Sequence, residues 1–311
     1  MLDKMTFSAY LTPKQEQHVI DQLRLIKCVK DKAVYWADSP YAQLTGMHCT
    51  IKGHKMKLSF SVHKQWENAQ SGHLDNSGSC TMSQALSVIT YLFAPDGLDI
   101  PLNRLRVRYF ELGLSFQMAH DPIMYIRQML SVGMDKNREM FIDYLYERDR
   151  QKVTSKTRFV RKVGKVYDKS FEAEDRGRDV PPRILRVETQ YKRMNIPLLE
   201  LLEPATLGKF VTTFYNDWSA VTWQRQVVGG KGAKESQLAK AREIIADGVD
   251  VYLYRHRQQW QSGQISDKAW RTFREFAQTW EDNKHRYHLE RGPLEAEYDD
   301  KFHNAFVYAQ S

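Results

Sequence analysis

"RLRVRYFELGLSF", residues 104–116, is the stretch that decides the fold, because it alternates apolar and polar side chains with a period of two. Phe110, Leu112, Leu114 and Phe116 fall on one face. Tyr109, Glu111, Gly113 and Ser115 fall on the other. This pattern predicts a strand with one face in a core and one polar face, as in antiparallel sheets.

The segments around this strand predict more strands and several helices. "MLDKMTFSAYL" is typical of a strand, and residues 33–62 read as three short strands. Thr12 and Pro13 begin one helix, and Asp121 and Pro122 begin another. "GSCTMSQALSVITYLFAPDG" predicts a helix that ends before Pro95. "TRFVRKVGKVYDKS" and "PRILRVETQYKR" predict two further strands, joined by a polar loop at 172–181.

The pattern becomes helical from Ile196 onward. We therefore expect an α+β fold, with an antiparallel sheet and covering helices in residues 1–200. A helical C-terminal region in residues 201–311 would follow, with a linker near 228–236. In that region Trp270 and Trp280 suit core packing, and "LYRHRQQWQ" at 253–261 is a candidate for phosphate contact.

Composition narrows the class of protein. The 311 residues include no apolar run of eighteen, and the N-terminus lacks the long apolar core of a signal peptide. The three cysteines form no CxxC pair, which argues against a disulfide framework and a cysteine-rich zinc site. We expect a cytoplasmic protein with no membrane partner.

Positive charge is concentrated in one segment. Residues 151–193 carry 13 Lys and Arg against 6 Asp and Glu, a net +7 of the chain's +8. Such a concentration suits a polyanion such as nucleic acid, although a solvated basic loop is the alternative. The candidate DNA contacts are Arg158, Arg161, Lys162, Arg186, Lys192 and Arg193.

The polar faces of four predicted strands point to one site. Glu111 lies on the strand described first, His63 follows Ser59 and Ser61 in "KLSFSVHK", and Glu188 follows Arg186 in "RILRVETQYKR". If the apolar faces cover one core, the polar faces form a common surface. Carboxylates suit Mg²⁺ or Mn²⁺, and Mn²⁺ also accepts imidazole.

Tyr167 in "KVGKVYDKS" is the candidate nucleophile. Period two places Lys165, Tyr167 and Lys169 on one face and Asp168 on the other. A phenol, with an ordinary pKa near 10, needs nearby positive charge or a base in order to attack. The lysines supply that charge and also bind phosphate. These are the components of a metal-assisted DNA nickase.

Each candidate has a structural alternative. Glu111 would pair with Arg106 or Arg108, and Glu188 with Arg186 or Lys192. A single histidine such as His63, or a tyrosine such as Tyr167, is commonly a packing residue. The pattern alone indicates a phosphate-handling face and leaves nuclease activity open.

The order of several motifs resembles a known family. "SVHKQW" and "SGHLDN" in 61–76, "LRVRYFELGLSF" at 105–116, "KVYDKSFE" at 165–172 and "ILRVETQYKR" at 184–193 precede "IPLLELLEPATLGKF". This succession resembles the phage and plasmid replication initiation proteins related to the gene II protein of filamentous phages, especially the versions from Bacteroidetes elements. The likeness covers about residues 1–225.

The resemblance implies rolling-circle initiation. Such a protein nicks one strand of origin DNA, single-stranded or cruciform, and becomes linked to the 5′ phosphate through a tyrosine, leaving a 3′ hydroxyl. The nucleophile maps to Tyr167. The motif carboxylates map to Glu111 and Glu188, and the motif histidine maps to His63; their role as metal ligands is inferred from chemistry.

Some features depart from related nickases or remain open. The chain has no His-x-His pair; His48 and His54 would share a strand face or flank a turn. A second nucleophile would have to be Tyr144 or Tyr146. "VGGKGAKES" at 228–236 does not match the phosphate-loop motif and reads as a linker, so a host helicase is expected to unwind the DNA. The alternative function is a non-catalytic origin-binding protein that uses the same basic region.

Overall fold

The computed structural model describes residues 1–31, 34–37, 42, 44–133, 138–141, 150–154, 161–230 and 232–310. The predicted positions Tyr144, Tyr146 and Arg158 lie outside these ranges. The chain forms two compact units: residues 1–223 with 297–311, and residues 224–296. They are called the sheet unit and the insert unit below.

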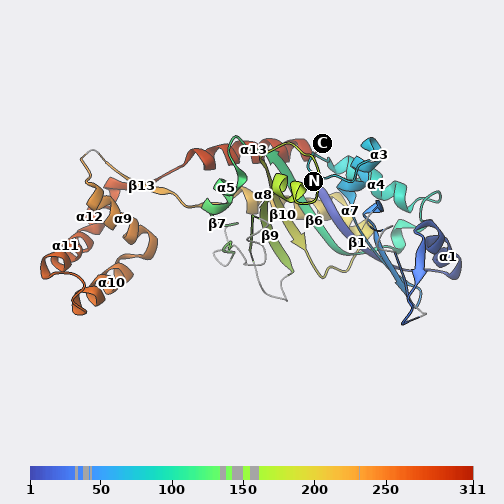
Figure 1. Cartoon of the computed structure of the whole chain (residues 1–311), viewed down its shortest axis with the longest axis horizontal. Helices are drawn as coiled ribbons and strands as arrows, with labels where there is room; N and C mark the ends of the chain where they lie inside the picture. The colour runs from blue at the N-terminus through green and yellow to red at the C-terminus, as the bar shows by residue number, and fades with distance from the viewer. Residues whose placement is uncertain are drawn as a thin grey trace. The chain divides into compact units, whose positions relative to one another are not determined.

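The sheet unit is built on one antiparallel sheet with the order β2-β3-β4-β5-β1-β6-β10-β9-β8, and β11 also pairs with β6. Figure 1 shows β1, β6, β10 and β9 of this sheet. The strands are β1 (Leu2–Tyr10), β2 (Leu25–Lys27), β3 (Val34–Ala37), β4 (His48–Lys52), β5 (Lys55–Ser61), β6 (Arg106–Gln117), β8 (Gln151–Val153), β9 (Lys162–Asp168), β10 (Ile184–Tyr191) and β11 (Ile196–Pro197). The predicted α+β fold with an antiparallel sheet is confirmed.

The stretch quoted first is the centre of this sheet. β6 pairs with β1 on one side and with β10 on the other. Its apolar residues Phe110, Leu112, Leu114 and Phe116 are all buried, as the alternation predicts. Glu188 on β10 lies opposite Gly113 on β6 and Lys165 on β9, so the polar side chains of three strands share the other face.

Helices cover the apolar face. Phe93 of α4 packs on Phe7 of β1 with ring centroids 5.2 Å apart, and Phe210 of α8 packs on Phe110 at 5.0 Å. Helix α13 adds Tyr298 against Phe116 at 5.7 Å. Aromatic side chains of this size supply much of the apolar area that the core buries.

The helices of the sheet unit begin at residues that favour helix starts. Ser61, Thr81 and Asp168 each accept a hydrogen bond from a backbone amide in the first turn. The helices are α1 (Pro13–Gln22), α3 (Val62–Ser71), α4 (Met82–Phe93), η1 (Leu102–Arg104), α5 (Pro122–Gln128), α6 (Lys169–Glu174), α7 (Leu198–Leu202), α8 (Pro204–Ser219) and α13 (Pro293–Gln310). A separate pair, β7 (Met129–Ser131) and β12 (Thr222–Trp223), completes the unit.

The insert unit has a small core of its own around Ile244, Tyr252 and Trp280. Its first and last elements, β13 and β14, pair with each other. The elements are β13 (Gln226–Gly229), α9 (Glu235–Asp247), α10 (Val249–Gln261), α11 (Asp267–Gln278), α12 (Trp280–Asn283), η2 (Lys284–Arg286) and β14 (Tyr287–Glu290). Trp280 is buried in this core, which agrees with the packing role expected for it.

Three details differ from the sequence expectations. β5 ends at Ser61, so His63 lies on α3 rather than on a strand. The region after residue 196 contains short strands as well as helices. Helix α8 and residues 297–310 belong to the sheet unit, so the compact units do not divide near residue 200. In the part of the chain described here, no helix has the length and hydropathy needed to cross a membrane.

Candidate functional site

The polar face of the sheet forms the floor of a cleft of about 890 Å³. Strand residues that line it are Asp3, Lys4, Glu111, Lys165, Tyr167, Glu188 and Gln190. Residues from helices and loops that line it are Lys64, Asn76, Lys169, Glu172, Arg176 and Arg178. The cleft therefore unites the predicted residues Glu111, Lys165, Tyr167, Lys169 and Glu188.

Three buried carboxylates meet on this floor. Asp3 from β1, Glu111 from β6 and Glu188 from β10 are only 4%, 7% and 5% exposed. One oxygen from each lies within 4.8 Å of the others. Three converging carboxylate oxygens are the ligand type that Mg²⁺ and Mn²⁺ prefer, so the residues fit the expected cation. We call these three residues the carboxylate triad.

Arg186 on β10 is the built-in counterion of the carboxylate triad. Its guanidinium donates to Glu188 Oε1 at 2.7 Å and also to Asp3 Oδ2. The remaining donor, Nη1, reaches Ser115 Oγ at 2.7 Å and the Asn76 carbonyl at 3.0 Å. With 1% exposure Arg186 cannot reach a ligand in solvent, so the expected DNA contact is wrong for this residue.

Gly113 provides room for this ion pair. A Cβ at position 113 would lie 2.9 Å from Arg186 Nη2 and 3.1 Å from Glu188 Cγ. Any larger side chain would therefore displace the guanidinium or the carboxylate. The glycine in the middle of the decisive strand has a steric reason that the period-two pattern does not reveal.

The triad carboxylates differ in protonation. Burial would raise the pKa of Asp3, but Arg186 outweighs it and holds that pKa well below its ordinary value. Burial, followed by the charges of Glu188 and Asp3, raises the pKa of Glu111 to about 8. Tyr109 and Gln190 both donate to Glu111 Oε1, Gln190 at 2.9 Å. At neutral pH the triad thus holds a proton on Glu111, which a bound cation would displace.

Tyr167 stands directly beside the triad. Its hydroxyl donates to Glu188 Oε1 at 2.7 Å, and the side chain is half-buried. Burial and the charge of Glu188 raise the pKa of Tyr167 well above its ordinary value, although Arg186 opposes them. The phenol is therefore protonated, with a carboxylate already placed to receive its proton.

Lys169 reaches the cleft by another route than the one predicted. β9 ends at Asp168, which caps α6, and Lys169 is the first residue of that helix. Its Nζ donates to Asn76 Oδ1 at 2.8 Å and pairs with Glu172, and the side chain is 1% exposed. Asp168 lines a separate cavity of about 380 Å³ with Arg150, in agreement with its predicted opposite face.

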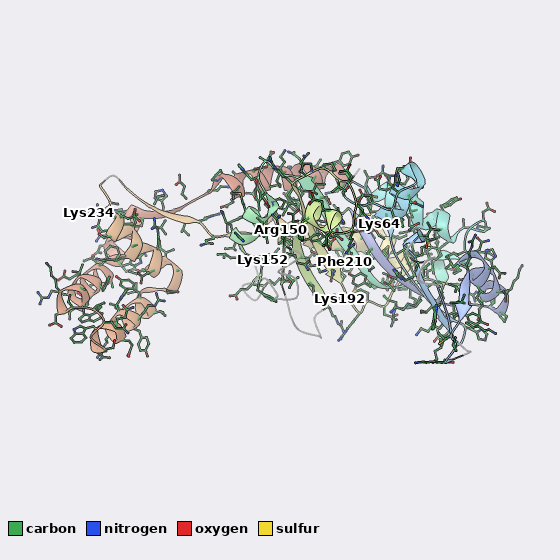
Figure 2. All side chains as sticks on the ribbon, in the orientation of Figure 1. Lys64, Arg150, Lys152, Lys192, Phe210 and Lys234 are labelled. Carbon is green, nitrogen blue, oxygen red and sulfur yellow. The ribbon has the colours of Figure 1, made fainter. Side chains whose placement is uncertain are left out.

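Cations that the sequence analysis did not select form a wall of the cleft. Lys64 projects from α3 (Figure 2), and burial, then Arg178 and Lys169, lower its pKa to about 8. Arg176 and Arg178 follow α6 and also line the cleft. They lie in the loop 172–181, whose basic residues were a signal that the strand pattern could not place.

The remaining predicted DNA contacts lie at different exposures. Arg161 and Arg193 are exposed. Lys162 pairs with Asp217 at 2.5 Å. Lys192 (Figure 2) is half-buried, and burial together with Lys165 lowers its pKa. None of Arg161, Lys162, Lys192 and Arg193 lines the cleft described above.

His63 does not join the triad. It lines a small cavity with Arg186 and Cys80, and its Nε2 lies 3.7 Å from Glu67 Oε1. The predicted metal set of Glu111, Glu188 and His63 is therefore replaced in the structure by Glu111, Glu188 and Asp3. The reason is the helix start at Ser61, which rotates His63 away from the strand face.

Asp3 was missed because β1 is irregular. Strict alternation would put Asp3 on the same face as buried Met5 and Phe7. The pairing of β1 with β6 shifts register between Leu2 and Met5, and this irregularity brings Asp3 to the polar face. His48, on β4, lines the cleft, whereas His54 sits in a turn at φ 61° beside Glu16.

No protein-family model matches this chain, and no curated protein matches it.

Proposed function

We propose that this protein is a metal-dependent DNA-nicking and strand-transferring enzyme of the rolling-circle type, with Tyr167 as nucleophile. The observation that carries the proposal is the hydrogen bond from the Tyr167 hydroxyl to Glu188 Oε1 at 2.7 Å. It joins a half-buried phenol to three buried carboxylates in one cleft.

The residues support an in-line transfer at phosphorus. Tyr167 Oη forms a bond to phosphorus, its proton passes to Glu188, and the bond between phosphorus and the 3′ oxygen breaks. The 3′ oxygen takes up a proton from solvent and leaves as a free hydroxyl, and the 5′ phosphate remains on Tyr167. A Mg²⁺ or Mn²⁺ ion held by the carboxylate triad would supply Lewis-acid polarisation of the phosphate.

The cations of the cleft suit the DNA backbone. Lys64, Lys165, Arg176 and Arg178 line it beside Tyr167. Point charges and guanidinium groups bind phosphate oxygens and offset charge that develops on them. The proposed substrate is origin DNA in single-stranded or cruciform form. A host helicase and a cytoplasmic location in a bacterial host belong to the same proposal.

A labelled single-stranded DNA library tests the proposal. With Mn²⁺ present, the wild-type chain should form a covalent protein–DNA adduct that survives denaturation, and Tyr167→Phe should form none. Tyr10→Phe is the matched control, because Tyr10 is 69% exposed on β1. Adduct formation by Tyr167→Phe would falsify the assignment of the nucleophile.

A non-catalytic origin-binding protein is the second candidate. Arg186 already compensates Asp3 and Glu188, which is the arrangement of a purely structural ion cluster. This candidate predicts DNA binding that weakens with salt and does not depend on a divalent ion. Cleavage that requires both Mn²⁺ and Glu111 excludes it.

A further inference from the structure

Unpaired buried polar atoms gather near α3. Among the described residues, three buried side-chain atoms lack a hydrogen-bond partner: His63 Nε2, Asp75 Oδ1 and Tyr252 Oη. Two of the three lie on α3 or in the loop that follows it. Buried polar groups are almost always paired, so two such atoms in one segment call for a common partner.

Glu67 connects these atoms. His63 and Glu67 are four residues apart on α3, which places them on one face of the helix. His63 is 4% exposed, and its Nε2 points at Glu67 Oε1 from 3.7 Å. That separation is too long for a hydrogen bond. Two atoms each about 2.1 Å from one tetrahedral ion lie about 3.4 Å apart, so a small contraction would let both bind the same ion.

Asp75 is the third member of this group. Ser77 fixes its other oxygen, Oδ2, through a backbone amide at 3.1 Å and through its hydroxyl. Oδ1 is therefore oriented, buried and unpaired. Burial lowers the pKa of His63 to about 3 and Asp75 opposes this, while burial and then Asp75 raise the pKa of Glu67. Asp75 thus lies within electrostatic range of both side chains.

Nearby positive charge does not prevent cation binding here. Arg186 lines the same small cavity as His63, but it is already paired with Asp3 and Glu188. A buried neutral imidazole needs no proton release before it binds a metal. One imidazole with two carboxylates, leaving a fourth position for water, is a ligand set that suits Zn²⁺.

We propose that His63 Nε2, Glu67 Oε1 and Asp75 Oδ1 bind a Zn²⁺ ion at a second site, separate from the carboxylate triad. The ion ties α3 to the loop 72–81. That loop carries Asn76, which bonds to Asp3, Lys169 and Arg186. The second site is therefore structural, and it positions the floor of the cleft without contacting the substrate.

Zn²⁺ titration of the full chain, without DNA, tests this site. The Glu111→Gln background weakens the triad, so one tight Zn²⁺ equivalent should remain in competition with a chromophoric chelator. Adding Glu67→Gln or His63→Gln should weaken that affinity by at least about tenfold. Co²⁺ in the site should give the intense visible absorption of a low-coordinate imidazole complex, which an all-oxygen site lacks.

His73→Gln is the matched control, because His73 is an exposed histidine in the same loop. It should bind Zn²⁺ as the background does. If His63→Gln fails to fold by circular dichroism, Glu67→Gln carries the test, since the Glu67 side chain is 28% exposed. The proposal is overturned if the background binds no Zn²⁺, or if Glu67→Gln binds it as tightly as the background. Because no cleavage is measured, this result is independent of the proposed nicking.

Discussion

The two carboxylate clusters of the sheet unit differ in how their charge is balanced. In the triad, Arg186 bonds to Asp3 and Glu188, and a proton resides on Glu111 at neutral pH. In the group of His63, Glu67 and Asp75, two atoms remain without a partner. Both clusters are rich in ligand atoms, yet only the first is electrostatically complete before a cation binds.

This difference teaches that proximity of carboxylates does not by itself set cation affinity. A cation at the triad must displace a proton and share Asp3 and Glu188 with a guanidinium, so its binding is weakened and depends on pH. A cation at the second site meets neither competitor. We therefore expect a reversible Mg²⁺ or Mn²⁺ ion at the triad and a retained ion at the second site.

The largest effect should come from removing the counterion. Arg186→Met leaves two buried carboxylates unpaired, which should lower the free energy of unfolding by about 3–5 kcal/mol. Urea denaturation measures this loss, and Mn²⁺ should restore part of it by taking the place of the guanidinium. Arg271→Met, on an exposed arginine of α11, should change stability little. Equal stabilities of the two variants would show that Arg186 does not compensate the triad.

The next effect concerns pH. The pKa of Glu111 is raised to about 8, so below that pH a cation must displace its proton. Mn²⁺ affinity should rise about tenfold per pH unit between roughly pH 6 and 8, and should level off above. Isothermal titration calorimetry across this range checks the slope. Glu111→Gln should bind more weakly and without this slope, and a flat wild-type profile would contradict the assigned protonation.

The smallest effect should come from the neighbouring phenol. The Tyr109 hydroxyl donates to Glu111 and lowers its pKa against the larger effects of burial, Glu188 and Asp3. Tyr109→Phe should therefore move the midpoint of the same Mn²⁺ profile upward, by about one pH unit. A midpoint that stays in place would mean that this hydrogen bond does not tune the triad.

Much of the cleft floor follows from strand alternation. β6, β9 and β10 are regular over the residues that matter, so period two places Glu111, Tyr167 and Glu188 on one face. The registers that set Glu188 opposite Lys165 and Arg186 opposite Tyr167 need a structure, because pairing depends on turns and loops between strands.

The misses have local causes. Asp3 escaped because of the irregular pairing in β1, which no residue type announces. His63 was placed on a strand although Ser61 is a good helix cap, so the capping signal was available and was outweighed by the alternation before it. Arg186 carried a charge that suggested DNA, and only its burial shows that it serves Asp3 and Glu188.

The division into units was hidden for a different reason. Tyr298, Phe302 and Phe306 recur every four residues on α13 and predict an apolar helix face. The sequence does not show which surface this face covers. In the structure Tyr298 packs on Phe116 and donates to the Trp218 carbonyl at 3.0 Å, across an insertion of more than seventy residues.

The discontinuity of the sheet unit sets the order in which the two units mature during synthesis. Residues 224–296 are contiguous and have their own core, so the insert unit is complete once they leave the ribosome. Phe116 on the central strand stays without its partners Tyr298 and Phe302 until α13 is made. The part of the chain synthesised first is thus finished last, and limited proteolysis of arrested nascent chains would reveal this order.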